Sequence, residues 1–147
     1  MFEQAQVNEG YNKALRLLSR RDHSEFELRQ KLAEYDGVDT IIQKLEQHGY
    51  VDDQRFAEVY VRYRSGLGQG PLKVRQELQR KGVSSSLVEV ALEQPDVDWF
   101  VVARRVFHAK FDVVATEYRS KAKQQRFMQA RGFTYEHISD AMRPPED

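Results

Sequence analysis

Two adjacent carboxylates, Asp52 and Asp53, come closest in type and spacing to a catalytic or metal-binding pair. Paired carboxylates can share a proton for acid and base catalysis, or they can hold a divalent cation. Both residues follow Gly49, which can end one helix, and they precede an apolar helical pattern. Carboxylates at such a position cap backbone N–H groups and interact favourably with the helix dipole. We therefore predict that the pair opens a helix, and a contact with a partner in addition to capping stays open.

Three glycines near the middle of the chain could suggest a phosphate-binding loop. Gly66, Gly68 and Gly70 are close enough in sequence to present several backbone N–H groups. However, no strand-like pattern precedes them, and no Gly-Lys-Ser or Gly-Lys-Thr follows. Pro71 suits the first position of a helix, so we interpret the segment as a flexible connection and predict no nucleotide site.

Serine, histidine and cysteine give no other catalytic or metal-binding pattern. Ser24 and Glu27 have the spacing of a capping box, which is a structural motif. The sequence has no cysteine, so disulfides and thiolate sites are excluded. The histidines lack the spacing of metal ligands and a neighbouring nucleophile and acid: His23, His48, His108 and His137. We therefore predict a protein without catalytic residues, metal or cofactor, which is not an enzyme.

Aromatic residues lie among basic residues in the last third of the chain, at Trp99, Phe100, Phe107 and Phe111. Aromatic rings interleaved with cations can stack on the bases of single-stranded nucleic acid. The helical spacing of these residues is also that of a buried helix face. We predict that they pack in a core, with base stacking as the alternative.

The basic residues are the remaining candidates for a binding function. The 23 basic and 23 acidic residues give zero formal charge, which argues against a protein that acts mainly by neutralising phosphates. The distribution is uneven, because residues 1–57 hold eight basic and eleven acidic residues, whereas residues 62–81 hold six basic residues and one acid. The predicted binding residues are Arg62, Arg64, Lys73, Arg75, Arg80, Lys81, Arg104, Arg105, Lys110, Lys121, Lys123, Arg126 and Arg131. The alternative is that they are solvated faces of amphipathic helices; the matching places of Arg29 and Arg75 fit a structural salt bridge or a shared binding stripe.

The elements that position these residues are predicted to be helices. Apolar residues recur at spacings of three and four, whereas no useful alternating, strand-like run occurs. One corner recurs: a glycine that ends a helix, an apolar residue that returns to the core, and a residue that caps the next helix. The three corners are Gly37-Val38-Asp39, Gly82-Val83-Ser84 and Gly132-Phe133-Thr134. The first is predicted to be wider, because one more residue separates Leu32 from Gly37 than separates Leu78 from Gly82.

The recurrence predicts an all-α fold of three tandem three-helix, helix-turn-helix-like repeats. Repeats of this length build elongated, curved arrays more often than one shared core. We expect an N-terminal extension at residues 1–10, a first repeat at 11–51, a second at 52–95, and a third at 96–147 that includes a short C-terminal tail. No segment has the basic start and apolar stretch of a signal peptide or the long uncharged stretch of a membrane span. We therefore expect a cytoplasmic protein without membrane contact.

The segment Gly-Tyr-Val-Asp-Asp-Gln-Arg-Phe-Ala lies at residues 49–57, between the first two predicted repeats. It resembles a signature of the RecX family, and further segments resemble that family in consistent order. The similarity continues at residues 68–71, 74–83, 96–99, 123–127 and 131–133, with Gln69 where an aromatic residue is common in relatives. The motif residues, with a structural or contact role, are Gly49, Tyr50, Asp52, Asp53, Phe56, Gly70, Pro71 and Trp99. Residues 1–10 match no family segment.

The resemblance implies a fold and an activity. The fold is three tandem three-helix repeats in an extended, curved arrangement. The activity is binding along the groove of the RecA filament on single-stranded DNA, which restrains ATP hydrolysis, strand exchange and the co-protease function of RecA in recombination, DNA repair and the SOS response. We expect a monomer, and weak direct binding to DNA stays open. The alternative is a helix-turn-helix transcriptional regulator, against which the zero net charge and the lack of an obvious dimer interface argue.

Overall fold

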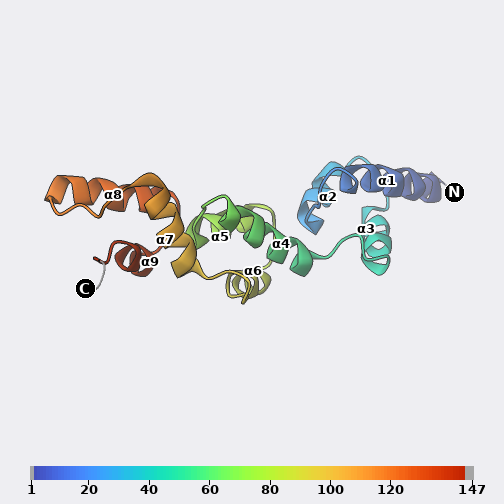
Figure 1. Ribbon diagram of the computed structural model, residues 1–147. Coiled ribbons are helices and arrows are strands. Elements are labelled where there is room, and N and C mark those ends of the chain that lie inside the picture. The colour runs from blue at the N-terminus through green and yellow to red at the C-terminus, as the bar shows by residue number, and fades with distance from the viewer. Residues whose placement is uncertain (1, 145–147) are drawn as a thin grey trace. The chain divides into compact units, whose positions relative to one another are not determined.

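The computed structural model describes residues 2–144, which form helices and connecting loops with no strand in that range (Figure 1). The all-α prediction is therefore confirmed. The helices are α1 Phe2–Leu18, α2 Glu25–Lys31, α3 Val38–Gln47, α4 Asp53–Gly66, α5 Pro71–Arg80, α6 Ser85–Leu92, α7 Trp99–Lys110, α8 Tyr118–Ala130 and α9 Tyr135–Ala141. None of the described helices is long and apolar enough to cross a membrane.

The helices follow one another in three groups of three, and a glycine corner joins the second and third helix of each group. Gly37, Gly82 and Gly132 have φ values of 78°, 78° and 96°, the left-handed conformation that glycine adopts without steric cost. Thr134 caps α9 as predicted, because its side chain accepts from the backbone N–H of His137. The predicted cap by Asp39 is wrong. The wider first corner lets α3 begin at Val38, so Asp39 lies within the first turn and its carboxylate binds Arg29 instead.

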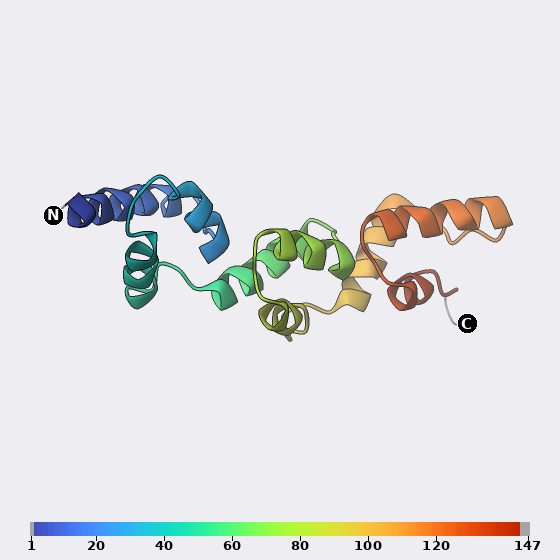
Figure 2. The ribbon, with the colours of Figure 1, turned by 180° about the vertical axis from the view of Figure 1, so that it is seen from behind.

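The first and the third repeat each have a hydrophobic cluster of their own. In the first repeat, α3 packs against α1 and α2 (Figure 1), and the buried residues are Val7, Ala14, Leu28, Leu32, Ile41, Ile42, Leu45 and Val51. In the third repeat, α9 packs against α7 and α8 (Figure 2), and the buried residues are Val102, Ala103, Val106, Phe107, Met128, Phe133, Ile138, Ala141 and Met142. The two clusters share no residue, as separate repeats require.

Contacts divide the chain into two compact units, and the division falls inside the second repeat. Unit 1 contains the residues up to Ala57 together with Leu78–Val88. Unit 2 contains Glu58–Glu77 and the residues from Glu89 onward. The predicted repeat boundaries stay predictions, and the predicted tail after Pro144 lies outside the described residues.

The structure tests two local predictions, the capping box at Ser24 and the packing of the aromatic residues around α7. The capping box is confirmed, because Ser24 Oγ accepts from Glu27 N at 3.2 Å and Glu27 Oε1 accepts from Ser24 N at 3.1 Å. The aromatic residues around α7 mainly pack in the hydrophobic cluster of the third repeat, as predicted. Phe107 is buried there, and Trp99 and Phe111 pack against that cluster. Phe100 is the exception, because its ring is 39% exposed.

Candidate binding surface

The carboxylate pair after Gly49 is structural in two different ways. Asp52 Oδ1 accepts from Arg55 N at 3.1 Å, which is the predicted cap at the start of α4. Asp53 Oδ1 instead accepts from Glu25 N at 2.9 Å and so satisfies a free N–H group at the start of α2. Each carboxylate thus satisfies a backbone N–H group at the start of a helix.

Burial raises the pKa of Asp53, and the neighbouring carboxylates of Glu25, Asp52 and Glu27 raise it further, whereas the bond from Glu25 N opposes the change. Burial and then Glu25 also raise the pKa of Glu46. Carboxylates in such surroundings are a cost to the folded state when they are ionised. Among the described residues, no group of three or more acids and histidines could hold a metal ion.

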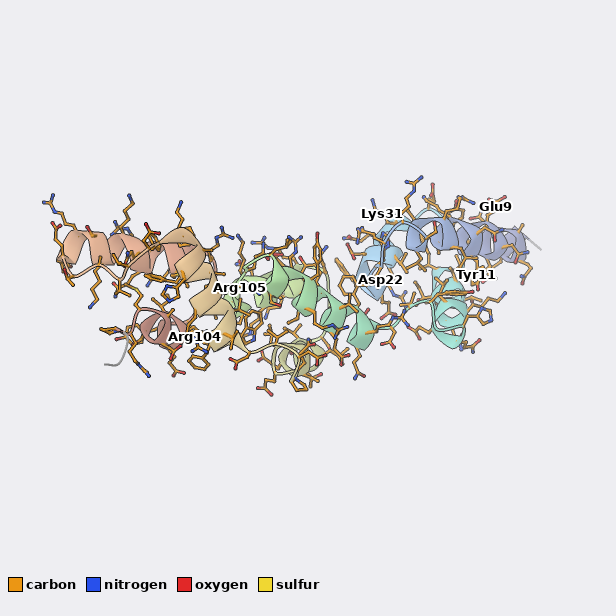
Figure 3. All side chains as sticks on the ribbon, in the orientation of Figure 1. Glu9, Tyr11, Asp22, Lys31, Arg104 and Arg105 are labelled. Atoms are coloured by element: carbon orange, nitrogen blue, oxygen red, sulfur yellow. The ribbon has the colours of Figure 1, made fainter. Side chains whose placement is uncertain are left out.

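The motif residue Tyr50 belongs to an exposed aromatic group, whereas the motif residue Phe56 is buried. Tyr50 is 48% exposed, and its ring meets the edge of the His48 imidazole at 6.2 Å between centroids. His48 Nδ1 lies 2.6 Å from the hydroxyl of Tyr11, which is labelled on α1 in Figure 3. Sequence reasoning missed the pairing of Tyr11 with His48, because 37 positions separate them and no local pattern connects them.

The later motif residues hold elements of unit 2 together. Trp99 Nε1 donates to the backbone oxygen of Leu92 at 2.9 Å. Gly70 N donates to the backbone oxygen of Arg131 at 2.6 Å, and Pro71 opens α5 as predicted. These contacts position helices, and Trp99 packs, partly buried, against the hydrophobic cluster of the third repeat.

The predicted basic residues separate into two classes. In the first class each cation pairs with a carboxylate: Arg62 with Asp96 at 3.9 Å, Arg64 with Glu77 at 3.7 Å, Arg75 with Glu89 at 2.7 Å, Lys81 with Glu27 at 3.3 Å and Arg104 with Asp140 at 2.5 Å. Arg29 also pairs, with Asp39 at 2.6 Å, so the matching arginines Arg29 and Arg75 make structural salt bridges. Cations of this class are already neutralised within the fold.

In the second class the cations have no carboxylate partner within residues 2–144. They are Lys73, Arg80, Arg105, Lys110, Lys121, Lys123, Arg126 and Arg131. Lys121 lines a hollow of about 660 Å³ beside the loop that precedes α8. A cation without an internal partner can exchange its hydration for an external anion at lower cost than a paired one.

Three cations of the second class meet in one place, which we call the basic hollow. Arg105, Lys110 and Arg131 line a hollow of about 330 Å³ in unit 2, together with Phe127. The remaining lining residues are uncharged: Gly66, Leu67, Gly68, Val106 and Ala109. The hollow therefore has three positive charges, an apolar wall and no carboxylate.

Helix ends and an aromatic ring hold these cations in position. Arg105 Nη2 donates to the backbone oxygen of Ser65 at 2.7 Å, near the end of α4. Lys110 Nζ and Arg131 Cζ lie 5.5 Å and 5.3 Å from the centroid of the Phe127 ring. The partial negative charge at the C-terminal ends of α4, α7 and α8 favours cations here. The arrangement can bind a phosphate or carboxylate group through charge-assisted hydrogen bonds.

Comparison with known proteins identifies the family. Models of the first, second and third three-helix domains of RecX match residues 11–36, 52–92 and 96–142. The chain is 44% identical to the regulatory protein RecX of Vibrio vulnificus, with 88% of each chain covered, and 41% identical to that of Halorhodospira halophila, with 87% and 83% covered. Its fold is similar to the crystal structure of RecX from Lactobacillus salivarius, with a TM-score of 0.79 at 24% identity over 95% of this chain and 96% of that one. The chain belongs to the RecX family.

Proposed function

We propose that this chain regulates the RecA recombinase by binding along the groove of the RecA filament on single-stranded DNA. Binding restrains ATP hydrolysis, strand exchange and co-protease activity. Membership of the RecX family carries the proposal, because similar relatives are named regulatory proteins. In this proposal the regulator acts by binding alone, as a cytoplasmic monomer without a cofactor. In support of a binding role, the carboxylates of Asp52, Asp53 and Glu89 cap helices or pair with a cation.

The binding residues are the cations without a carboxylate partner, and the basic hollow is their main anion site. A paired cation such as Arg104 loses an ion pair when it turns to a new partner, whereas Lys110 and Arg131 lose none. The expected ligands are phosphates of the single strand, contacted weakly and directly. Neutralising about three phosphates on a single strand gives a slope of log affinity against log salt near −2.

The test measures ATP hydrolysis and co-sedimentation of RecA on single-stranded DNA with the purified chain added. We expect reduced hydrolysis and co-sedimentation with the filament. The variant Lys110→Gln with Arg131→Gln should inhibit at least about tenfold more weakly, because it removes two charges from the hollow. The matched control is Arg104→Gln, which changes the cation next to Arg105 on α7 (Figure 3) but lies outside the hollow. Unchanged hydrolysis with no bound chain would reject the proposal, and equal loss in both variants would reject the role of the hollow.

A second charge variant tests the basic residues of α5. Reversing Lys73, Arg75, Arg80 and Lys81 together would place like charges beside Glu89 and Glu27, so a loss of binding could reflect a disturbed fold. Reversing only Lys73 and Arg80 avoids that problem. We expect weaker filament binding with unchanged helicity, measured by co-sedimentation and circular dichroism.

A gel-shift assay separates this proposal from a transcriptional regulator. Weak, salt-sensitive binding to any single strand or duplex fits the proposed contact with phosphates. Strong binding to one duplex sequence, retained at physiological salt, would favour a helix-turn-helix regulator instead.

A further inference from the structure

A repeated contact links the start of a second helix to the glycine corner of the following repeat. We define a glycine corner as the glycine with left-handed φ that joins the second and third helix of a repeat, together with the residue before it. In unit 1, Ser24 at the start of α2 donates from Oγ to the backbone oxygen of Lys81 at 2.6 Å. A Cβ added to Gly82 would overlap the side chain of Phe26, so α2 lies directly on the corner Lys81–Gly82.

Unit 2 contains the same contact one repeat later. Gly70 N and Leu72 N donate to the backbone oxygens of Arg131 and Gly132 at 2.6 Å and 2.9 Å. A Cβ added to Gly132 would lie 2.8 Å from the backbone nitrogen of Lys73. A glycine corner is therefore a docking surface for a helix, because its missing Cβ permits close approach and its backbone offers hydrogen bonds.

The third corner, Asp36–Gly37, is covered by the beginning of α1. Gln6 Oε1 accepts from Asp36 N at 3.0 Å. Val7 Cγ2 lies 2.8 Å from the position of a Cβ on Gly37, and Glu3 Cγ lies 3.4 Å from it. Glu3, Gln6 and Val7 are on one face of the helix by their spacing. This corner thus accepts the side of a continuous helix.

The residues that cover this corner are an addition to the repeat. Ala14, Ala57 and Ala103 occupy matching, fully buried places in the first helix of each repeat. α4 and α7 begin four residues before their alanine, at Asp53 and Trp99, whereas α1 begins twelve residues before Ala14. Residues 2–9 therefore add about two turns, and these turns lie over the first glycine corner.

Among the described residues, the start of α8 makes no contact with a glycine corner like those of α2 and α5. α8 is the second helix of its repeat, as α2 and α5 are in theirs, yet Tyr118 at its start is 85% exposed. Its first residues are helical throughout and carry cations without carboxylate partners in the described part of the chain, at Arg119, Lys121 and Lys123. At the corner itself Asp36 is exposed and has no cationic partner in the described part of the chain, whereas the nearby acids Glu34 and Asp39 pair with Lys13 and Arg29. Asp36 is opposite in charge to the cations at the start of α8.

We propose that residues 2–9 keep the corner Asp36–Gly37 closed against a second copy of this chain, whose α8 start would otherwise dock there head to tail. The internal segment prevails because its effective concentration is in the millimolar range, far above that of a second copy. Head-to-tail docking repeats from copy to copy and produces rings or open chains.

Deleting residues 2–9 tests the proposal by sedimentation velocity. Wild type should sediment as one species, whereas the deletion should form larger species whose share rises with concentration. Adding Arg119→Glu, Lys121→Glu and Lys123→Glu to the deletion should restore the single species. A deletion variant that keeps its helicity and does not associate would overturn the proposal, as would association that the three reversals leave unchanged.

A cross-linking experiment covers the case in which the deletion does not fold. The sequence has no cysteine, so Asp36→Cys and Tyr118→Cys can be placed in separate chains and mixed under oxidising conditions. Combined with Gln6→Ala and Val7→Ala in the first chain, which loosen the cover and keep the helix, the pair should form a mixed disulfide. Wild-type residues at 6 and 7 should suppress it. Equal cross-linking with and without the cover would overturn the proposal, and RecA has no part in either outcome.

Discussion

Unit 1 and unit 2 make the same contact between a helix start and a glycine corner, but they use different chemistry. In unit 1 a serine hydroxyl, the Phe26 ring and the ion pair of Lys81 with Glu27 form the contact. In unit 2 backbone meets backbone, because Gly70 lies against Gly132 with no side chain between them. The start of a helix that rests on side chains can shift away from an added atom more easily than two hydrogen-bonded backbone segments can separate. The unit 1 contact should therefore tolerate substitution and respond to pH, and the unit 2 contact should do neither.

The largest expected effect is that of Gly70→Ala. The new Cβ would lie 2.5 Å from the backbone oxygen of Gly132 and 2.6 Å from Phe133 N, so the backbones must separate. We expect a loss of about 3 kcal/mol in the free energy of unfolding, measured with urea. Gly66→Ala is the control, because nothing lies within 4 Å of its Cβ, and it should change stability by less than about 1 kcal/mol. Similar effects of the two variants would contradict the backbone contact.

Gly82→Ala should cost less, about 2 kcal/mol, because the nearest atoms, Cβ and Cγ of Phe26, belong to one half-exposed residue, and the start of α2 can shift to make room for the new methyl group. Gly49→Ala isolates the conformational part of this cost. Gly49 has φ 75°, close to the 78° of Gly82, but nothing lies within 4 Å of its Cβ. Introducing Phe26→Gly, which removes the Cβ and ring that the new methyl group would meet, should reduce the cost of Gly82→Ala to that of Gly49→Ala. If a double-mutant cycle shows no such coupling, the unit 1 contact is as rigid as that of unit 2.

Ser24→Ala tests the hydrogen bond of the unit 1 contact, which should contribute less to the free energy of unfolding than either of the two glycine substitutions costs. Ser24 and Thr134 both cap a helix within a capping box, but only Ser24 also binds the corner of another repeat. Thr134→Ala should cost about 1 kcal/mol for the cap, and Ser24→Ala about 1 kcal/mol more for the bond to the Lys81 carbonyl. Thermal and urea unfolding of both variants would measure the difference, and equal costs would show that the bond to the corner adds no stability.

The smallest expected effect is that of pH on Glu27. Burial tends to raise the pKa of Glu27, but hydrogen bonds from Arg21 and Ser24 N and the charge of Lys81 outweigh it and lower the pKa below its ordinary value. A carboxyl with a lowered folded-state pKa contributes stability above its ordinary pKa, and this contribution is lost as pH falls through the lowered value. Glu27→Gln should therefore cost up to about 1 kcal/mol at neutral pH and nothing in strong acid. A cost that is constant with pH would contradict the ionic contribution to unit 1.

Features that depend on neighbouring residues could be predicted from the sequence. The three corner glycines, the capping box at Ser24 and the cap by Asp52 were all predicted correctly, because spacings of three or four residues determine them. The cap by Asp39 was predicted wrongly, since the extra residue in the first corner changes where α3 begins.

The division of the basic residues could not be predicted. Arg62 and Asp96 are far apart in sequence, as are Arg104 and Asp140, so no local pattern indicates which cations are neutralised. The basic hollow has the same origin, because α7, α8 and the loop after α4 each contribute to it. The bond of Asp53 to Glu25 N likewise joins positions 28 residues apart. Such contacts depend on how the helices pack.

The position of Trp99 gives the protein an internal optical probe. It is the sole tryptophan in the sequence, and its indole N–H is bonded to Leu92 within unit 2. Its emission should therefore report the melting of unit 2, while far-ultraviolet circular dichroism reports helix throughout the chain. Coincident transitions would mean that the two units unfold together, and separate ones would show which unit opens first.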